Sequence, residues 1–189
     1  MTQSETAIPW ETPPELWRGF RTSELTWIGR VESIFITPNA SGTMMSVPQV
    51  HALADRGLEG DRFFRESWNA IKRPDKAVSL IEAEVLEVAA RELGVDDISD
   101  RTRRNIVTRG VPLVELLHRE FTVGGVLMRG IRLFEPCGHM EKLAAVAGIF
   151  KALENRSGLK AAILGDGVIR AGDAVRLHQG SHISAPQAG

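Results

Sequence analysis

The stretch GGVLMRGIRLFEPCGHMEKL, from Gly124 to Leu143, places a turn, a strand, a cysteine and the start of a helix in that order. The two glycines favour a tight turn. The mostly apolar run 126–135 then predicts a strand. A helix is expected over residues 140–155, where apolar residues recur at spacings of three and four. Cys137, the only cysteine of the chain, is therefore predicted to lie between a strand and a helix.

Other short segments have the same strand-like character. They are residues 27–37, 49–57, 76–80, 104–110, 159–165 and 167–178. The last of these contains Ala171-Gly172-Asp173, a turn signal that predicts two short strands joined by a tight connection.

Few helices accompany these strands. One is expected after Ser79, whose spacing to Glu82 fits a capping box, with Gly94 as its end. A shorter helical turn is expected to start at Pro112. Many short strands with glycine-rich turns and few helices predict a mainly β fold. We expect a β-barrel or a strongly bent sheet with peripheral helices.

Composition narrows the class of protein. The chain has 189 residues, 43% of them hydrophobic and 25% charged, which is typical of a globular protein with one sizeable core. A net charge of -1 argues against a general nucleic-acid binder. One cysteine excludes an intrachain disulfide framework, and the histidines lack the spacing of a structural zinc site. With neither a signal-peptide pattern nor an apolar run long enough to span a membrane, a cytoplasmic location is expected.

The residues alone leave three alternatives for Cys137. Backbone N–H groups at a helix start favour thiolate, the form that binds metals or attacks electrophiles. His139 is close enough in sequence to deprotonate the thiol in a Cys-His enzyme, although no partner for the histidine can be predicted. A free cysteine is also a common buried apolar filler.

Arginines gather just before the strand predicted at 104–110. Arg101, Arg103 and Arg104 form either a solvated charged face or an anion pocket, because guanidinium groups match phosphate geometry. Strand alternation predicts Arg101 and Arg103 on one face and Arg104 on the other. Asn105 offers a hydrogen-bond donor and an acceptor beside them.

Two further places carry candidate binding residues. The segment GLEGDRFF presents Asp61 and Arg62 on a glycine-rich turn, which is either a phosphate-cradling loop or an ordinary loop. Arg132 lies on the strand that delivers Cys137. It either helps to place a negative ligand near the thiol or is an exposed strand residue.

Taken in order, five segments resemble the MOSC domain family, the C-terminal domain of molybdenum cofactor sulfurases. They are GLEGDRFF, KAVSLIEAEVLE, TRRNIVTRGVPL, GGVLMRGIRLFEPCGHMEKL and GLKAAILGDGVIRAGDAVRL. The resemblance runs from about Trp27 to His178 and implies a closed or partly closed, mainly antiparallel β-barrel over residues 27–179. Residues 1–26 are then an N-terminal extension, and residues 180–189 are expected to be a disordered tail.

The resemblance also implies a ligand and a site. The family is associated with the molybdenum cofactor, molybdopterin, and Cys137 matches its metal-ligating cysteine. Arg103, Arg104 and Asn105 match the segment expected to hold pterin and phosphate, with Asp61 and Arg62 behind them and Arg132 as a further candidate.

Three functions remain open at this point. The first is an oxidoreductase that reduces small N-hydroxylated compounds with electrons from an external donor protein. The second is a non-catalytic carrier of the cofactor, or of sulfur as a Cys137 persulfide supplied by a partner desulfurase. The third is a metal-free nucleophilic enzyme built on Cys137 and His139.

Overall fold

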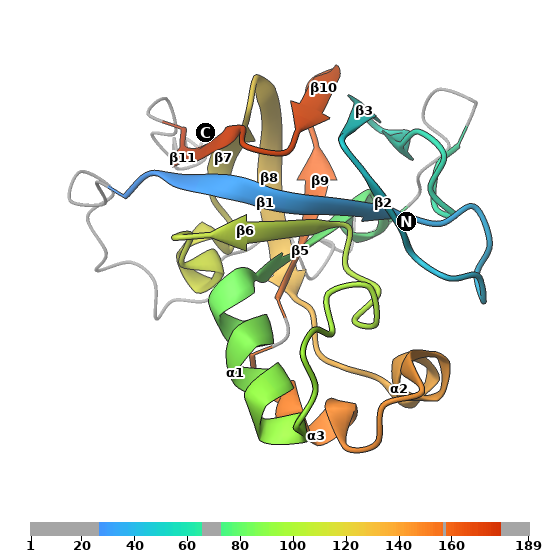
Figure 1. Cartoon of the computed structure of the whole chain (residues 1–189). Coiled ribbons are helices and arrows are strands. Elements are labelled where there is room, and N and C mark those ends of the chain that lie inside the picture. The colour runs from blue at the N-terminus through green and yellow to red at the C-terminus, as the bar shows by residue number, and fades with distance from the viewer. Residues whose placement is uncertain (1–26, 66–72, 157, 179–189) are drawn as a thin grey trace, which may run out of the picture.

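The computed structural model describes residues 27–65, 73–156 and 158–178 (Figure 1). Its strands are β1 (Gly29–Ile36), β2 (Met45–Val47), β3 (Gln49–Leu53), β4 (Gly57–Leu58), β5 (Val78–Glu82), β6 (Ile106–Arg109), β7 (Glu120–Val123), β8 (Val126–Leu133), β9 (Leu159–Ile163), β10 (Gly167–Arg170) and β11 (Ala174–Leu177). Its α-helices are α1 (Ala83–Leu93), α2 (Gly138–Ala144) and α3 (Ile149–Ala152), and its 3-10 helices are η3 (Pro74–Lys76) and η4 (Leu113–Leu116). The predicted extension 1–26 and tail 180–189 lie outside the described residues.

Seven strands of the described chain close into a barrel in the order β11-β7-β8-β9-β5-β6-β1, and β1 pairs with β11 to complete the ring. Neighbours in the ring are antiparallel except β5 and β6, which are parallel and joined through α1. Strand β2 pairs with β1 outside the ring, and β10, β3 and β4 form a separate small sheet. The predicted mainly antiparallel β-barrel is confirmed.

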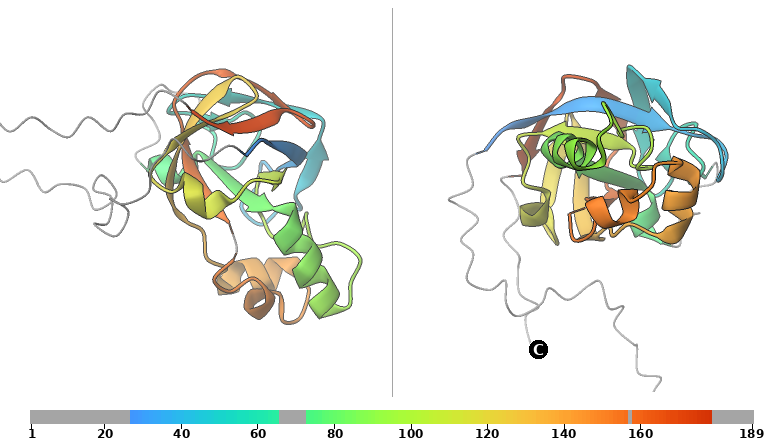
Figure 2. Two further views of the ribbon diagram at one scale, coloured as in Figure 1. Left: turned by 90° about the vertical axis from the view of Figure 1, so that its left-hand side faces the viewer. Right: turned by 60° about the horizontal axis from the view of Figure 1, so that its bottom comes forward.

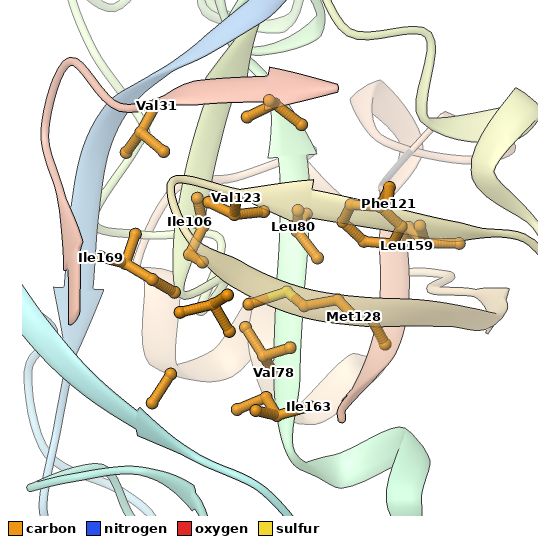
Figure 3. Packing of buried hydrophobic residues seen from close by; sticks show 14 of the residues in the cluster. Val31, Val78, Leu80, Ile106, Phe121, Val123, Met128, Leu159, Ile163 and Ile169 are labelled. Atoms are coloured by element: carbon orange, nitrogen blue, oxygen red, sulfur yellow. The ribbon is translucent and has the colours of Figure 1, made fainter. Parts of the chain in front are cut away.

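The barrel is filled by side chains. Leu80, Phe121 and Met128 are completely buried and lie among the core residues seen from close by in Figure 3. A second apolar cluster lies beneath the helices, which gather on one side of the barrel (Figure 2). Because strand side chains alternate between faces, β8 buries Val126 and Met128 while Arg129 is exposed. None of the helices in the described ranges is long and apolar enough to cross a membrane.

The strands predicted from sequence are present, with β2, β4 and β7 in addition. Strand β7 precedes Gly124, and the two-glycine turn joins it to β8. The turn predicted at 171–173 joins β10 to β11. These short strands carry weak sequence signals of their own, and their neighbours in the sheets fix them.

Two helix predictions are wrong in detail. Ser79 does not cap α1, because it lies inside β5 and its hydroxyl donates to the Asn105 Oδ1 at 2.8 Å. The capping position belongs to Glu82, which makes no side-chain cap. The helix predicted over 140–155 is two helices, because Ala145 and Gly148 adopt positive φ values of 53° and 81°. The expected end at Gly94 and the short turn after Pro112 are confirmed.

Gly130 allows η4 to pass directly against β8. A Cβ built on Gly130 would lie 2.1 Å from the carbonyl oxygen of Leu116. The backbone there is locked on both sides, since His118 N–H donates to Gly130 O and Gly130 N–H donates to Arg119 O. We expect Gly130→Ala to lower the free energy of unfolding by about 2 kcal/mol or more.

The matched control is Gly125→Ala, whose added Cβ meets nothing within 4 Å. We expect it to change stability by less than about 1 kcal/mol. Urea unfolding of the two variants checks this, and equal stability losses would show that the close approach at Gly130 is unimportant.

Candidate functional site

Cys137 lies in the short connection between β8 and α2, as predicted, and its residue is exposed. Its backbone is extended, with φ -139° and ψ 156°, so the strand ends before the helix begins. This exposure rules out the buried apolar filler. In the part of the chain that the structure describes, no three His, Cys, Asp or Glu side chains gather as a metal site.

Cys137 lines a cavity of about 350 Å³, hereafter the main cavity. Cations dominate its wall, namely Arg62, Arg65, Lys76, Arg103, Arg104 and Lys160. The other lining residues include Phe63, Phe134, Ser79, Asn105, Asp75 and His139. Among the described residues Asp75 is its one lining carboxylate, so the wall carries a clear excess of positive charge. Its volume lies in the range of small-molecule pockets.

The arginine run is neither a strand nor a solvated face. Residues 101–103 form a turn, Arg103 has φ 61°, and β6 begins only at Ile106, so the predicted strand alternation is wrong. Arg103 and Arg104 are 7% and 1% exposed. Only Arg101 keeps a half-exposed side chain. Tertiary packing brings both buried arginines to the main cavity together with Cys137.

The Arg104 guanidinium is held in place from two directions. Its Nη1 donates to the Thr102 carbonyl at 2.8 Å, and its Nη2 donates to the Phe134 carbonyl at 3.1 Å. The guanidinium carbon lies 3.5 Å from the centroid of the Phe134 ring, a cation–π contact. Burial lowers the pKa of Arg104 to about 9, a cost that nearby Cys137 and Glu135 partly offset.

Arg103 fixes the loop that follows β1. Its Nη1 donates to Gly42 O at 2.8 Å and its Nη2 to Ala40 O at 2.7 Å. Burial, reinforced by the charge of Arg62, lowers the pKa of Arg103. On the other side of Arg103 lies a smaller hollow of about 240 Å³, lined by residues 41–44 and Asp100, Arg101 and Leu143.

A buried hydrogen-bond network holds the floor of the main cavity. Asn105 Oδ1 accepts from the backbone and hydroxyl of Ser79, and its Nδ2 donates to Phe35 O and to Asp61 Oδ1. The Asp61 carboxylate also accepts from Thr37 N–H and Phe63 N–H. The predicted donor and acceptor roles of Asn105 are thus used inside the protein.

Asp61 lies behind the cavity wall, where it holds Arg62. The Arg62 Nη1 donates to Asp61 Oδ1 at 3.2 Å, and its guanidinium stacks over the Phe63 ring at 4.8 Å. Burial lowers the pKa of Arg62, and the charge of Asp61 opposes this shift. The GLEGDRFF turn is therefore pinned to the barrel by a buried carboxylate.

Arg132 does not line the main cavity. Its side chain is 46% exposed, and its Nε donates to Asp75 Oδ2 at 2.9 Å. Asp75 is buried beneath it and also accepts from Arg73. The hydrogen bonds from Arg132 and Arg73 lower the pKa of Asp75 although burial opposes this.

Sequence reasoning missed Lys160, Asp75, Phe134 and Phe63. Lys160 lies on β9 beside Arg132 of β8, with a side chain 12% exposed. Burial and the charge of Arg132 lower its pKa to about 8, and Asp75 only partly opposes this. A lysine inside a predicted strand was the available signal, since a strand residue of this kind faces either solvent or a site.

A family model described as the MOSC domain matches residues 51–176, more than half of the chain. No curated protein matches the chain.

Solved structures share the fold. The YuaD protein from Bacillus subtilis is 16% identical, with 82% of this chain and 100% of that one covered and a TM-score of 0.65. YiiM from Geobacillus stearothermophilus is 17% identical, covering 80% and 75%, with a TM-score of 0.63. YiiM from Escherichia coli is 20% identical, covering 82% and 72%, with a TM-score of 0.60. At these sequence identities the similarity establishes the fold alone, and the chemistry must be argued from the residues of the site.

The Asp61 carboxylate should be essential for the fold around the cavity. Asp61→Asn weakens four accepted hydrogen bonds and leaves Arg62, whose side chain is 9% exposed, without a countercharge. We expect it to lower the free energy of unfolding by about 3 kcal/mol. Glu59→Gln, at a side chain 59% exposed, should change stability by less than about 0.5 kcal/mol. Chemical denaturation checks both, and a small loss at Asp61 would contradict the assignment.

Lys160 should make stability depend on pH. Its pKa is about 8 in the folded chain against an ordinary value of 10.5, so the unfolded chain binds the proton more tightly. The resulting penalty is complete below pH 8 and disappears as the pH rises toward 10.5. We expect Lys160→Met to be more stable than the unaltered protein below pH 8, by about 1–3 kcal/mol.

The advantage of Lys160→Met should shrink between pH 8 and pH 10.5, measured by urea unfolding across that range. Lys76→Met, at an exposed lysine of the same cavity, is the control for the substitution itself and should change stability by less than about 0.5 kcal/mol. A Lys160→Met advantage that is flat with pH would contradict the shifted titration.

Proposed function

This chain belongs to the MOSC domain family, which is associated with binding of the molybdenum cofactor, and from that premise we propose that it binds this cofactor in the main cavity. We further propose that the loaded protein is an oxidoreductase that reduces small N-hydroxylated compounds. One observation carries the proposal: an exposed thiol lines a cavity whose wall holds six cations and one carboxylate.

The thiol fits the metal end of the cofactor. A thiolate is a soft ligand and suits a metal centre that already carries dithiolene sulfur. Cys137 reaches the cavity from a connection between two elements, so it can meet a ligand without opening the barrel. No group of three or more His, Cys, Asp or Glu side chains that could hold a metal is found among the described residues, so Cys137 is the candidate ligand that they offer.

The cations fit the anionic parts of the cofactor. Arg104 and Arg103 are buried at the wall, and their hydrogen bonds to carbonyl oxygens fix their guanidinium groups in place. Because these charges are desolvated and outnumber the carboxylates, an anion that enters the cavity gains more than it would at a solvated surface. This wall is supported by the hydrogen bonds among Asn105, Asp61 and Arg62. Arg132 contributes indirectly, because it donates to Asp75, which lines the cavity.

The cofactor, when bound, supplies a redox-active metal. The overall reaction adds two electrons and two protons to R–NH–OH and gives R–NH2 and water. The chain's residues orient the ligand through Cys137 and the cationic wall. His139, exposed at the wall beside Cys137, is placed to exchange protons with solvent at the substrate side.

Electrons would come from a separate donor protein. The single cysteine of these 189 residues cannot hold an iron–sulfur cluster, whose iron atoms need several thiolates. The exposed thiol leaves the metal end of the cavity near the surface, which suits transfer from a docked donor.

The second candidate is a carrier of the cofactor, or of sulfur as a persulfide on Cys137. The exposure of Cys137 favours this candidate as well, because a partner desulfurase must reach the thiol. The third, a Cys-His nucleophilic enzyme, has less support, because no hydrogen bond joins the Cys137 thiol to the His139 imidazole among the described residues.

Molybdenum content tests the first proposal. We expect protein expressed in a cofactor-competent host to hold near-stoichiometric molybdenum by elemental mass spectrometry. Cys137→Ser should lower the metal content at least about tenfold, because it removes the soft thiolate ligand. Its free energy of unfolding should stay close to that of the unaltered protein, because the exposed side chain changes little in size.

His139→Gln serves as the neighbouring control and should keep the metal. Metal retained with reduction of a hydroxylamine or amidoxime supports the oxidoreductase, and metal retained without turnover supports the carrier. Absence of molybdenum from the unaltered protein and from both variants would contradict cofactor binding. Cys137 would then be a candidate for sulfur transfer or thiol chemistry.

A further inference from the structure

Two cations share one aromatic ring in the wall of the main cavity. The Arg104 guanidinium carbon lies 3.5 Å and the Lys160 Nζ lies 4.2 Å from the centroid of Phe134. All three residues line the cavity. A ring face stabilises a cation only modestly, and it neutralises no charge. The pair therefore keeps its positive charge beside the cavity.

Among the described residues, Asp75 is the carboxylate that lies beside Lys160, and Glu135 lies near Arg104. Asp75 is already bound by other cations. Asp75 Oδ2 lies 2.9 Å from an Arg73 nitrogen and 2.9 Å from Arg132 Nε, whereas Lys160 Nζ is 3.9 Å away. Asp75 therefore binds three cations, and its contact with Lys160 is the longest of the three. The cations described here outnumber the carboxylates Asp75 and Glu135; they are Arg73, Arg104, Arg132 and Lys160. Arg104 and Lys160 are largely buried, so water screens their charges poorly.

The neighbours of Lys160 come from several elements, and most of them are charged. Arg132 lies opposite it on β8, Ser79 lies opposite it on β5 without charge, and Asp75 with Arg73 lies at η3. Arg104 approaches from the turn before β6. Three guanidinium groups thus surround one amine and one carboxylate.

We propose that Arg104 and Lys160, on the Phe134 ring, form an anion subsite that binds a phosphate or phosphomonoester dianion and that Lys160 takes up a proton when the anion binds. The subsite rests on the proposed function in one respect: it is where the phosphate end of the cofactor would lie. Its anion chemistry is independent of any metal.

Titration of Lys160 supports the coupling. With a pKa of about 8 in the ligand-free protein, the amine is about half neutral at pH 8. A bound dianion favours the ammonium form and raises that pKa, so binding draws a proton from solution. Affinity should therefore be full below pH 8 and fall as the pH rises through 8, while Arg104, with a pKa of about 9, stays largely charged.

Calorimetric titration of the metal-free protein with sulfate tests this. Sulfate is a dianion throughout pH 6.5–8.5, so any proton taken up in this range belongs to the protein. Repeating the titration at pH 8 in buffers of different ionisation enthalpy measures that uptake, which we expect to be about half a proton. Inorganic phosphate and an aryl phosphomonoester are the second and third probes.

Three variants separate the role of Lys160 from charge in general. Lys160→Met should weaken sulfate binding about tenfold or more and abolish the uptake, since one charge-assisted hydrogen bond is lost. Lys160→Arg should keep the affinity and lose both the uptake and the pH dependence, because its charge does not titrate in this range. Lys151→Met, at an exposed lysine of α3 that does not line the cavity, should change neither.

Unchanged sulfate affinity and proton uptake in Lys160→Met, or equal losses in Lys151→Met, would overturn the subsite. Tighter binding of the phosphomonoester than of phosphate would identify the ligand as the end of a larger molecule, and equal binding would identify a free anion. Proton-coupled binding in a protein that never acquires molybdenum would sustain the subsite and reject the cofactor. Molybdenum held by Cys137, with unchanged sulfate binding in Lys160→Met, would support cofactor binding and reject the subsite.

Discussion

The site depends on the buried amide of Asn105. Its side chain connects three segments that are far apart in sequence: Ser79 on β5, Phe35 on β1 and Asp61 in the loop after β4. A buried polar group of this kind is tolerated only when every hydrogen-bonding atom finds a partner, so the three segments can meet in one arrangement. That arrangement sets the turn immediately before Asn105, from which Arg103 and Arg104 reach the cavity. The barrel is the rigid part, and Asn105 fixes the cavity arginines relative to it.

The price of the cavity is a concentration of poorly solvated positive charge. Arg62, Arg103, Arg104 and Lys160 all have lowered pKa values, and burial is the largest cause in each. Asp61 and Asp75 offset part of this charge from behind the wall and at its edge. Such an arrangement is costly in the empty protein and favourable once an anion enters, because the ligand supplies the missing countercharge. The metal-ligating role proposed for Cys137 and the anion subsite at Phe134 would then hold two parts of one ligand.

The site residues divide by how far sequence could predict them. The position of Cys137 between β8 and α2 follows from local signals: a glycine turn, a run of strand residues and then a helix start. Its exposure was left open by the sequence and is decided by the structure. Arg103 and Arg104 were expected near the ligand, but on a strand with alternating faces; the positive φ of Arg103 produces a turn instead. Lys160 could not be singled out, because its neighbours Arg132, Asp75 and Phe134 come from other elements and its depressed pKa exists only after they pack. Arg132 was expected either to place an anion near the thiol or to be an exposed strand residue; it is exposed on β8 and donates to Asp75.

The sequence by itself determined the strand-rich pattern, the main turns, the end of α1 at Gly94 and the placement of one thiol, because these depend on residues within a few positions of one another. The tertiary structure decided the closure of β1 onto β11, the parallel pairing of β5 with β6 and the break between α2 and α3. It also decided which charges are buried together. Burial and countercharge are properties of contacts across the barrel, and a single sequence carries no local signal for them.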